Sequence, residues 1–303
     1  MAAEGSTKAV VTAMFANGGI AVAKFVAFAF TGASSMLAEG IHSVADTTNQ
    51  ALLLLGSKRA KLEATSEHPF GYGRERYFWS FVVALILFSL GGVFALYEGI
   101  EKLRHPHEIE SVTWAVGVLL VAITFESYAL YTAVTESNKV RGRLSWPQFV
   151  RRAKTPELPV ILLEDTGALI GLVLALVGVG LAEITGDPMW DALGTISIGI
   201  LLVLIAIVLA IEMKSLLIGE SASRPDRQAI EEAISTHPAV EQLIYFRTQH
   251  LGPDELLVAG KIELHRNMTF HDVADTIDEI EARVRETVPE ATLIYLEPDE
   301  APA

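Results

Sequence analysis

Long apolar stretches dominate the first two-thirds of the chain, whereas the last third alternates apolar and polar residues over short distances. A helix needs about 20 mostly apolar residues to cross a bilayer. Six stretches reach that length: 9–30, 36–56, 77–99, 112–136, 158–181 and 189–213. A soluble protein would seldom bury six such helices joined by short links. The pattern therefore predicts an all-α bundle of six transmembrane helices over residues 1–219.

The remaining residues, 220–303, have the rhythm of a small soluble domain. The expected elements are a helix, two strands, a second helix and a last strand, at 225–237, 240–249, 255–265, 269–288 and 291–297. Gly252 and Pro253 mark the turn between the first two strands. This αββαβ order predicts an α+β domain with helices on one face of a sheet.

Charge and composition narrow the function classes. The chain has no Cys, which excludes disulfides, thiolate metal sites and Cys nucleophiles. Of the formal charge of −14, residues 220–303 carry −11, from 18 acidic and 7 basic side chains. A domain this acidic should repel nucleic acid, and we therefore expect no nucleic-acid partner. The first eight residues lack a basic segment and a cleavage site, so the first apolar stretch is expected to stay as a helix.

Basic residues in the short loops predict the orientation, because Lys and Arg are retained on the cytoplasmic side. They concentrate before the first span and after the second and fourth: Lys8; Lys58, Arg59, Lys61, Arg74 and Arg76; Lys139, Arg141, Arg143, Arg151, Arg152 and Lys154. The opposite side carries Lys102 and Arg104 alone. Both termini are therefore expected in the cytoplasm, and the membrane is expected to be the inner membrane if the source is a bacterium.

Ionisable residues inside the spans are the candidate functional groups, because charge in a bilayer is costly. His42 and Asp46 are four residues apart in the second span, and Asn49 follows three residues later on the same helical face. The fifth span carries Glu164 and Asp165. Asp46 lies about 15 Å and Asp165 about 10 Å from the cytoplasmic ends of their helices, so the two can converge.

An imidazole, carboxylates and an amide oxygen converging in a dry bundle suit a borderline-soft divalent cation. Zinc accepts these N and O donors, and Mn, Fe, Co and Ni compete for similar sites. The remaining polar residues of the spans have plainer interpretations. Glu126 is either a proton-pathway group or a structural partner of another helix, Lys24 is a counter-charge or a snorkelling side chain, and Asn17 bonds a neighbouring helix.

These residues resemble a known family, the cation diffusion facilitators, which are metal-cation/proton antiporters that include the zinc transporters. The resemblance rests on Asn17, Lys24 and the run from Ser34 to Asp46, and on the short loop His68-Pro69-Phe70-Gly71-Tyr72-Gly73-Arg74. It implies a transporter rather than an enzyme, a homodimer joined partly through the tails, and a ferredoxin-like, metallochaperone-like C-terminal domain. It also implies that His42 and Asp46 form half of the transport site and that Asp165 belongs to the other half.

Two departures from the family pattern concern metal ligands. The first ligand position of the fifth span is Ile161, which cannot bind metal, so Glu164, Asn49 or water must complete the site. Tyr72 stands where the family's loop site often has a His. In the tail, Ile244, Lys261 and Tyr295 occupy expected ligand positions, so the four remaining His residues are predicted to lie on a solvated surface: His237, His250, His265 and His271.

The function that follows is proton-coupled export of a divalent metal, with zinc as the first candidate and no cofactor. Binding needs a neutral His and ionised carboxylates, so metal and protons compete for the same atoms. His42 is the natural exchanger, because its ordinary pKa of about 6.5 lies near working pH. A membrane-anchored regulator with a degenerate site is the alternative, favoured by Ile161. The pattern leaves open the metal, the proton stoichiometry, metal binding by the tail, and the membrane of a eukaryotic protein.

Overall fold

The computed structural model describes the backbone of residues 2–31, 34–106 and 112–301, and the side chains of these residues except 2–6, 27, 28, 30, 31, 34–39, 41 and 42. The chain forms two compact units. Residues 1–58 and 75–214 make the first, and residues 59–74 and 215–303 make the second. The predicted domain boundary after residue 219 stays a prediction.

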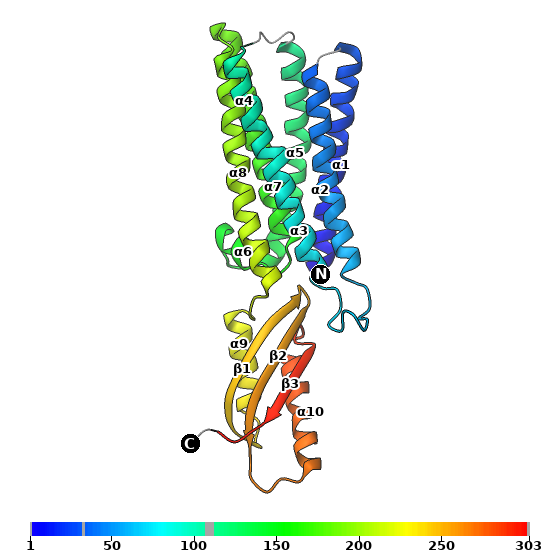
Figure 1. Ribbon diagram of the computed structural model, residues 1–303, viewed down its shortest axis with the longest axis vertical. Helices are drawn as coiled ribbons and strands as arrows, with labels where there is room; N and C mark the ends of the chain where they lie inside the picture. Colours follow the sequence, from blue (N-terminus) through cyan, green and yellow to red (C-terminus); the bar gives the residue numbers. More distant parts are fainter. Residues whose placement is uncertain (1, 32–33, 107–111, 302–303) are drawn as a thin grey trace. The chain divides into compact units, whose positions relative to one another are not determined.

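The first unit is a bundle of long helices that run side by side (Figure 1). Its elements are α1 (Ala2–Thr31), α2 (Ser34–Arg59), α3 (Glu75–Ile86), the π-helical stretch η1 (Leu87–Val93), α4 (Phe94–Arg104), α5 (Val112–Arg141), α6 (Trp146–Arg152), α7 (Glu157–Thr185) and α8 (Met189–Ile218). The stretches α3, η1 and α4 follow one another without a break. Because successive long helices run in opposite directions, the start of α1 and the end of α8 lie at the same end of the bundle.

Five of the six predicted spans are confirmed as helices long and apolar enough to cross a membrane: Thr7–Val26, Glu75–Arg104, Val112–Arg141, Glu157–Thr185 and Met189–Ile218. The second predicted span is a helix of 26 residues, α2. Among the described residues it is not one of these five. Its sequence is also less apolar than theirs, because it carries the ionisable and amide side chains that made it a candidate for function.

Large apolar side chains cover the outside of the bundle. Phe15, Tyr97 and Tyr128 are 72%, 65% and 64% exposed, and Leu204 and Ile211 also face outwards. A water-soluble protein would bury most of such a surface, whereas lipid solvates it. These exposed apolar side chains lie on the helices that are long enough to span a membrane. Their exposure is therefore expected if lipid surrounds the bundle.

Glycines bring α8 against the α3–α4 helix almost backbone to backbone. A Cβ at Gly199 would lie 2.7 Å from the backbone N of Leu96, and one at Gly92 would lie 3.0 Å from that of Val203. In a membrane, small residues of this kind allow helices to associate by close packing. Gly92 lies in the π-helical stretch, a distortion often found at functional positions.

The second unit confirms the predicted αββαβ order. Its elements are α9 (Arg224–Ser235), β1 (Val240–Gly252), β2 (Glu255–Leu264), α10 (Phe270–Thr287) and β3 (Leu293–Pro298). The strands form one sheet in the order β1-β2-β3, with β1 antiparallel and β3 parallel to the central β2. Alternate residues of β2 are buried, and both helices contribute to the same apolar core, as Ile234 of α9 and Ile280 of α10 do. The result is a two-layer domain (Figure 1).

Candidate metal site

A cavity of about 190 Å³ lies between the helices of the bundle. Five long helices and the π-helical stretch contribute its walls. The lining residues are Asn17, Ile20 and Lys24 of α1; Ser43 and Asp46 of α2; Leu87 of η1; Leu119, Ala122 and Glu126 of α5; Glu164, Asp165, Gly167, Ala168, Gly171, Leu172 and Ala175 of α7; and Ile198 and Leu202 of α8.

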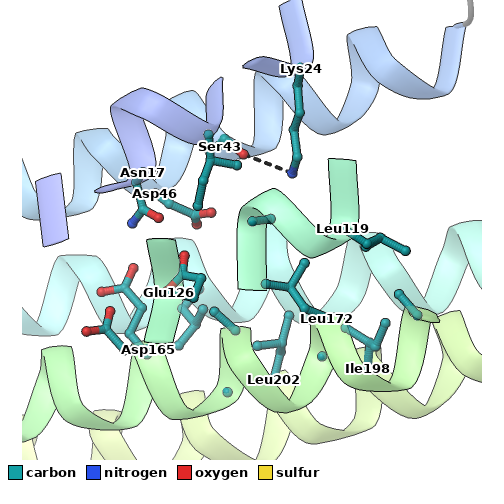
Figure 2. A pocket seen from close by; sticks show the side chains of 18 residues that line it. Asn17, Lys24, Ser43, Asp46, Leu119, Glu126, Asp165, Leu172, Ile198 and Leu202 are labelled. Atoms are coloured by element: carbon teal, nitrogen blue, oxygen red, sulfur yellow. Dashed lines mark hydrogen bonds between the residues drawn. The ribbon is translucent and has the colours of Figure 1, made fainter. Parts of the chain in front are cut away.

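The cavity has one polar end and one apolar end. Figure 2 shows the carboxyl groups of Asp46, Glu126 and Asp165 gathered at one end, on three different helices. The side chains of Leu119, Leu172, Ile198 and Leu202 line the other end. A cation inside the bundle would therefore find its oxygen donors on one side of the cavity.

Two of the predicted ligands, Asp46 and Asp165, line this cavity together. Asp165 is 1% exposed, and its Oδ2 atom has no hydrogen-bond partner among the described residues. A buried acceptor left unpaired costs about 1–3 kcal/mol, so this oxygen is poised for a ligand. His42 is one helical turn before Asp46 on α2, and its side chain lies outside the described residues.

Glu164 also lines the cavity, but its carboxylate is hydrogen-bonded to side chains of α2. Its two carboxyl oxygens accept hydrogen bonds from Asn49 Nδ2 at 3.0 Å and Gln50 Nε2 at 3.1 Å. Asn17 Nδ2 in turn donates to Gln50 Oε1 at 3.4 Å, which links α1 to this chain of amides. Because each oxygen already accepts one hydrogen bond, the Glu164 carboxylate is fixed between α2 and α7.

Asn49 does not line the cavity, although it is only 1% exposed. Its amide nitrogen faces Glu164, and its Oδ1 atom has no hydrogen-bond partner among the described residues. Ile161 is fully buried and is likewise absent from the cavity wall. In this arrangement Asn49 orients Glu164 and does not face the cavity itself.

Glu126 lines the cavity, but it was not among the metal ligands predicted from the sequence. It is 4% exposed on α5, and its Oε2 atom has no hydrogen-bond partner among the described residues. The other charged residues that line the cavity are Lys24, Asp46, Glu164 and Asp165. The available signal was an acidic residue in the middle of an apolar span, but its partners could not be read from one helix alone.

Lys24 is the basic residue that lines the same cavity. Its Nζ atom donates a hydrogen bond to Ser43 Oγ at 3.0 Å, between α1 and α2 (Figure 2). The side chain is 6% exposed, so it lies inside the bundle and does not snorkel to the surface. Of the two interpretations drawn from the sequence, its position fits a counter-charge for the carboxylates.

The cavity combines carboxylate oxygens from several helices, the ammonium group of Lys24 and an apolar end. Such a site can bind a divalent metal ion and release it again. Among the described side chains, no three His, Asp or Glu residues already stand close enough to hold a metal ion. Glu126 and Asp165 carry unpaired oxygens and line the cavity.

Comparison with known families agrees with this site. Residues 10–218 match the cation efflux transmembrane domain, and residues 222–299 match the cytoplasmic domain of cation efflux proteins. The chain belongs to the cation diffusion facilitator family. It is therefore a multi-pass integral membrane protein of a transporter family and not an enzyme.

The sequence of the chain is similar to those of several proteins from other organisms. The human protein named proton-coupled zinc antiporter SLC30A9, mitochondrial, is 34% identical over 270 residues, which is 88% of this chain and 46% of the relative. Metal tolerance protein C4 of Arabidopsis thaliana is 27% identical over 88% of this chain and 59% of its own length. Magnetosome protein MamB of Paramagnetospirillum magneticum is 24% identical over 90% and 87%. The chain thus spans about half the length of the zinc antiporters that it matches.

The accessory ligand positions of the cation diffusion facilitator family are occupied by other interactions here. In the loop, the Tyr72 hydroxyl lies 3.3 Å from Thr65 Oγ1, and the Tyr72 ring lies 4.6 Å from that of His68. In the tail, Lys261 pairs with Asp299 and Glu297 at 2.5 and 3.1 Å. The two carboxylates raise the pKa of Lys261, and Lys261 lowers the pKa of Asp299. The positively charged ammonium group of Lys261 therefore occupies the place expected for a metal ligand.

The prediction that the tail's four His residues lie on the surface is wrong for two of them. His237 and His250 are 8% and 6% exposed, whereas His265 and His271 are exposed. His237 Nε2 lies 3.1 Å from Glu279 Oε2, a contact between the end of α9 and α10. Burial follows from this tertiary contact, which the local sequence does not reveal.

Proposed function

We propose that this chain exports a divalent metal from the cytoplasm in exchange for protons, with zinc as the cargo. The observation that carries the proposal is the set of carboxylates around one cavity inside a membrane-spanning bundle, with unpaired buried oxygens on Glu126 and Asp165. Such charges are costly in a bilayer and mark ion pathways. The human and Xenopus laevis relatives are named proton-coupled zinc antiporters, which supports both the cargo and the coupling.

The proposed transport site consists of His42, Asp46 and Asp165, with Glu164 next to Asp165 and held in place by Asn49. Imidazole and carboxylate donors suit zinc, and Mn, Fe, Co or Ni would be carried by the same mechanism. Metal binding requires these groups to be deprotonated, so each binding event releases protons. That competition couples metal export to proton entry without any further device.

In this proposal α2 is the sixth span. Its polar face turns towards α7 and α1, as the contacts of Asn49 and Gln50 with Glu164 and Asn17 indicate. Polar side chains facing the inside of a bundle are tolerated in a membrane, so low hydropathy does not exclude a span. The transmembrane domain would then cover residues 1–219, with both termini and the domain of residues 220–303 in the cytoplasm, and two copies would form a homodimer.

A second cavity lies next to the first, and we propose that the metal passes through both. It contains Lys102, whose Nζ atom lies 3.0 Å from Asp191 and 3.6 Å from Glu98. Leu119, Ala175, Ile198 and Leu202 line both cavities. We propose that this apolar layer separates the two compartments and that its rearrangement opens the carboxylate site to one side at a time.

Transport by purified protein in sealed liposomes tests the function. Each metal would be offered alone, Zn²⁺, Mn²⁺, Fe²⁺, Co²⁺ and Ni²⁺, with and without an opposing pH gradient. The proposal expects zinc transport that a proton gradient accelerates. A membrane-anchored regulator, the alternative favoured by Ile161, would show no metal-dependent flux for any of these ions, and that result would refute the transport function.

A further inference from the structure

Ile161 leaves the α7 side of the proposed site one donor short. It lies four residues before Asp165, one turn along the same helix, where an imidazole or carboxylate would face the same ion. Its side chain is fully buried and apolar, and it takes no part in the cavity wall. The missing donor must therefore come from elsewhere in the bundle.

Glu164 is poorly placed to be that donor. Both of its oxygens accept hydrogen bonds from amides of α2, at 3.0 and 3.1 Å. Turning towards an ion in the cavity would break one or both of these bonds and leave a buried amide unpaired, at about 1–3 kcal/mol each. Its position next to Asp165 also points it about 100° away around the helix.

Glu126 has the unpaired carboxyl oxygen that Glu164 lacks. It lines the same cavity as Asp46 and Asp165, it is buried, and its Oε2 atom has no hydrogen-bond partner among the described residues. Figure 2 shows its carboxyl group at the polar end of the cavity, with those of Asp46 and Asp165.

We infer that Glu126 on α5 is the ligand that replaces the one lost at Ile161, so that the metal is held by α2, α5 and α7. This inference rests on the proposed function and deepens it. A third helix then takes part in binding, and α5 is drawn to the site whenever an ion is bound. The substitution also exchanges a nitrogen or aspartate donor on α7 for a longer glutamate, which favours harder cations such as Mn²⁺ more than an imidazole would.

The test measures binding of Zn²⁺ and of Mn²⁺, each alone, to the full-length protein in detergent by calorimetry. Loss of a residue that merely orients a ligand lowers metal affinity about 10- to 100-fold, so Glu126→Gln should lower it by at least that much. The matched control is Glu136→Gln, a buried glutamate ten residues along the same helix whose partners are Lys8 and Lys139. The control should bind both metals as the unchanged protein does.

A second variant distinguishes a ligand from a residue needed only for folding. Adding Ile161→His to Glu126→Gln should restore zinc affinity and raise the preference for Zn²⁺ over Mn²⁺, because a nitrogen donor replaces an oxygen donor. Unchanged affinity in Glu126→Gln, or no recovery in the double variant when Ile161→His alone binds zinc normally, would overturn the inference. Absence of binding and transport in the unchanged protein would instead refute the proposed function, so the two failures can be told apart.

Discussion

Arg76 on α3 and Glu157 on α7 form an ion pair inside the protein, with two hydrogen bonds of 2.6 and 2.8 Å between guanidinium and carboxylate. Their side chains are only 7% and 1% exposed. Ser57 on α2 donates a further hydrogen bond to the same carboxylate at 3.1 Å. Three helices are therefore tied together where α2 ends and α3 and α7 begin.

Glu157→Gln should destabilise the bundle strongly. Removing one member of a buried pair leaves the other charge without compensation, which costs about 3–5 kcal/mol. The unfolding midpoint in detergent should fall clearly below that of the unchanged protein. Glu136→Gln is the control, since its partners Lys8 and Lys139 are 65% and 60% exposed and can turn to water. Equal unfolding midpoints for the two variants would show that the Arg76 pair contributes no more than a surface pair.

Asp165→Asn should abolish metal-dependent transport, because it removes the charged donor that α7 contributes to the proposed site. The side chain is nearly the same size, so the folded protein should survive. Metal flux in liposomes measures the first effect, and size-exclusion chromatography measures the second. Near-normal transport by this variant would refute a site shared by α2 and α7.

Much of the fold could be predicted from local pattern. Apolar length predicts six spans, five of which are confirmed, and alternation at Leu256, Val258 and Ile262 predicts the buried face of β2. The helices run further than predicted, for example Glu75–Arg104 against 77–99, because helix formation continues through charged residues beyond the apolar stretch. The π-helical stretch has no comparable local signal.

The site could be predicted only in part. The i,i+4 spacing on α2 and the paired acids of α7 lead to residues around one cavity, Asp46 among them. How each helix is rotated about its axis decides the rest, and spacing along one helix does not determine it. That rotation turns Asn49 towards Glu164 and Glu126 towards the cavity. The burial of His237 against Glu279 depends on tertiary packing in the same way.

A single thiol at Ile198 should report which side of the membrane the cavities face. Ile198 lines both cavities, and the chain has no Cys, so Ile198→Cys introduces the only thiol. A membrane-impermeant thiol reagent should label it from one side at a time, and the labelling rate should change when zinc is added. Ile211→Cys, on the lipid-facing surface, is the control and should label slowly throughout. Labelling of Ile198→Cys that is independent of both zinc and the side of addition would contradict alternating access.

The isolated segment 220–303 should fold without metal and bind zinc at most weakly. It has its own apolar core, which includes Ile230, Val258 and Ile280. Lys261 occupies one expected ligand position and is neutralised by Asp299 and Glu297. Circular dichroism with and without a chelator should give the same unfolding curve. Tight, stoichiometric zinc binding by calorimetry would show that the tail forms a metal site after all.

Glu164 and Asn49 should differ sharply when each is substituted. Glu164→Gln places an amide against the two amide donors Asn49 and Gln50, so at least one hydrogen bond is lost and the negative charge disappears from the cavity. Metal affinity and stability should both fall, the latter by about 1–3 kcal/mol. Asn49→Ala removes one of two donors and leaves the charge, so it should change metal affinity only a few-fold, less than the 10- to 100-fold range of strong orienting residues.

Zinc titrations of both variants at two pH values measure these effects and separate the roles that remain for Glu164. A carboxylate that contributes its charge to the ion loses affinity at both pH values when it becomes an amide. A carboxylate that only carries protons keeps its metal affinity, while the pH dependence of transport changes. Asn49→Ala is the internal reference, because it disturbs the same hydrogen-bonded contact without removing charge. Unchanged affinity and an unchanged pH response in Glu164→Gln would exclude Glu164 from the mechanism and leave Asp46, Glu126 and Asp165 as the cavity acids available to bind the metal.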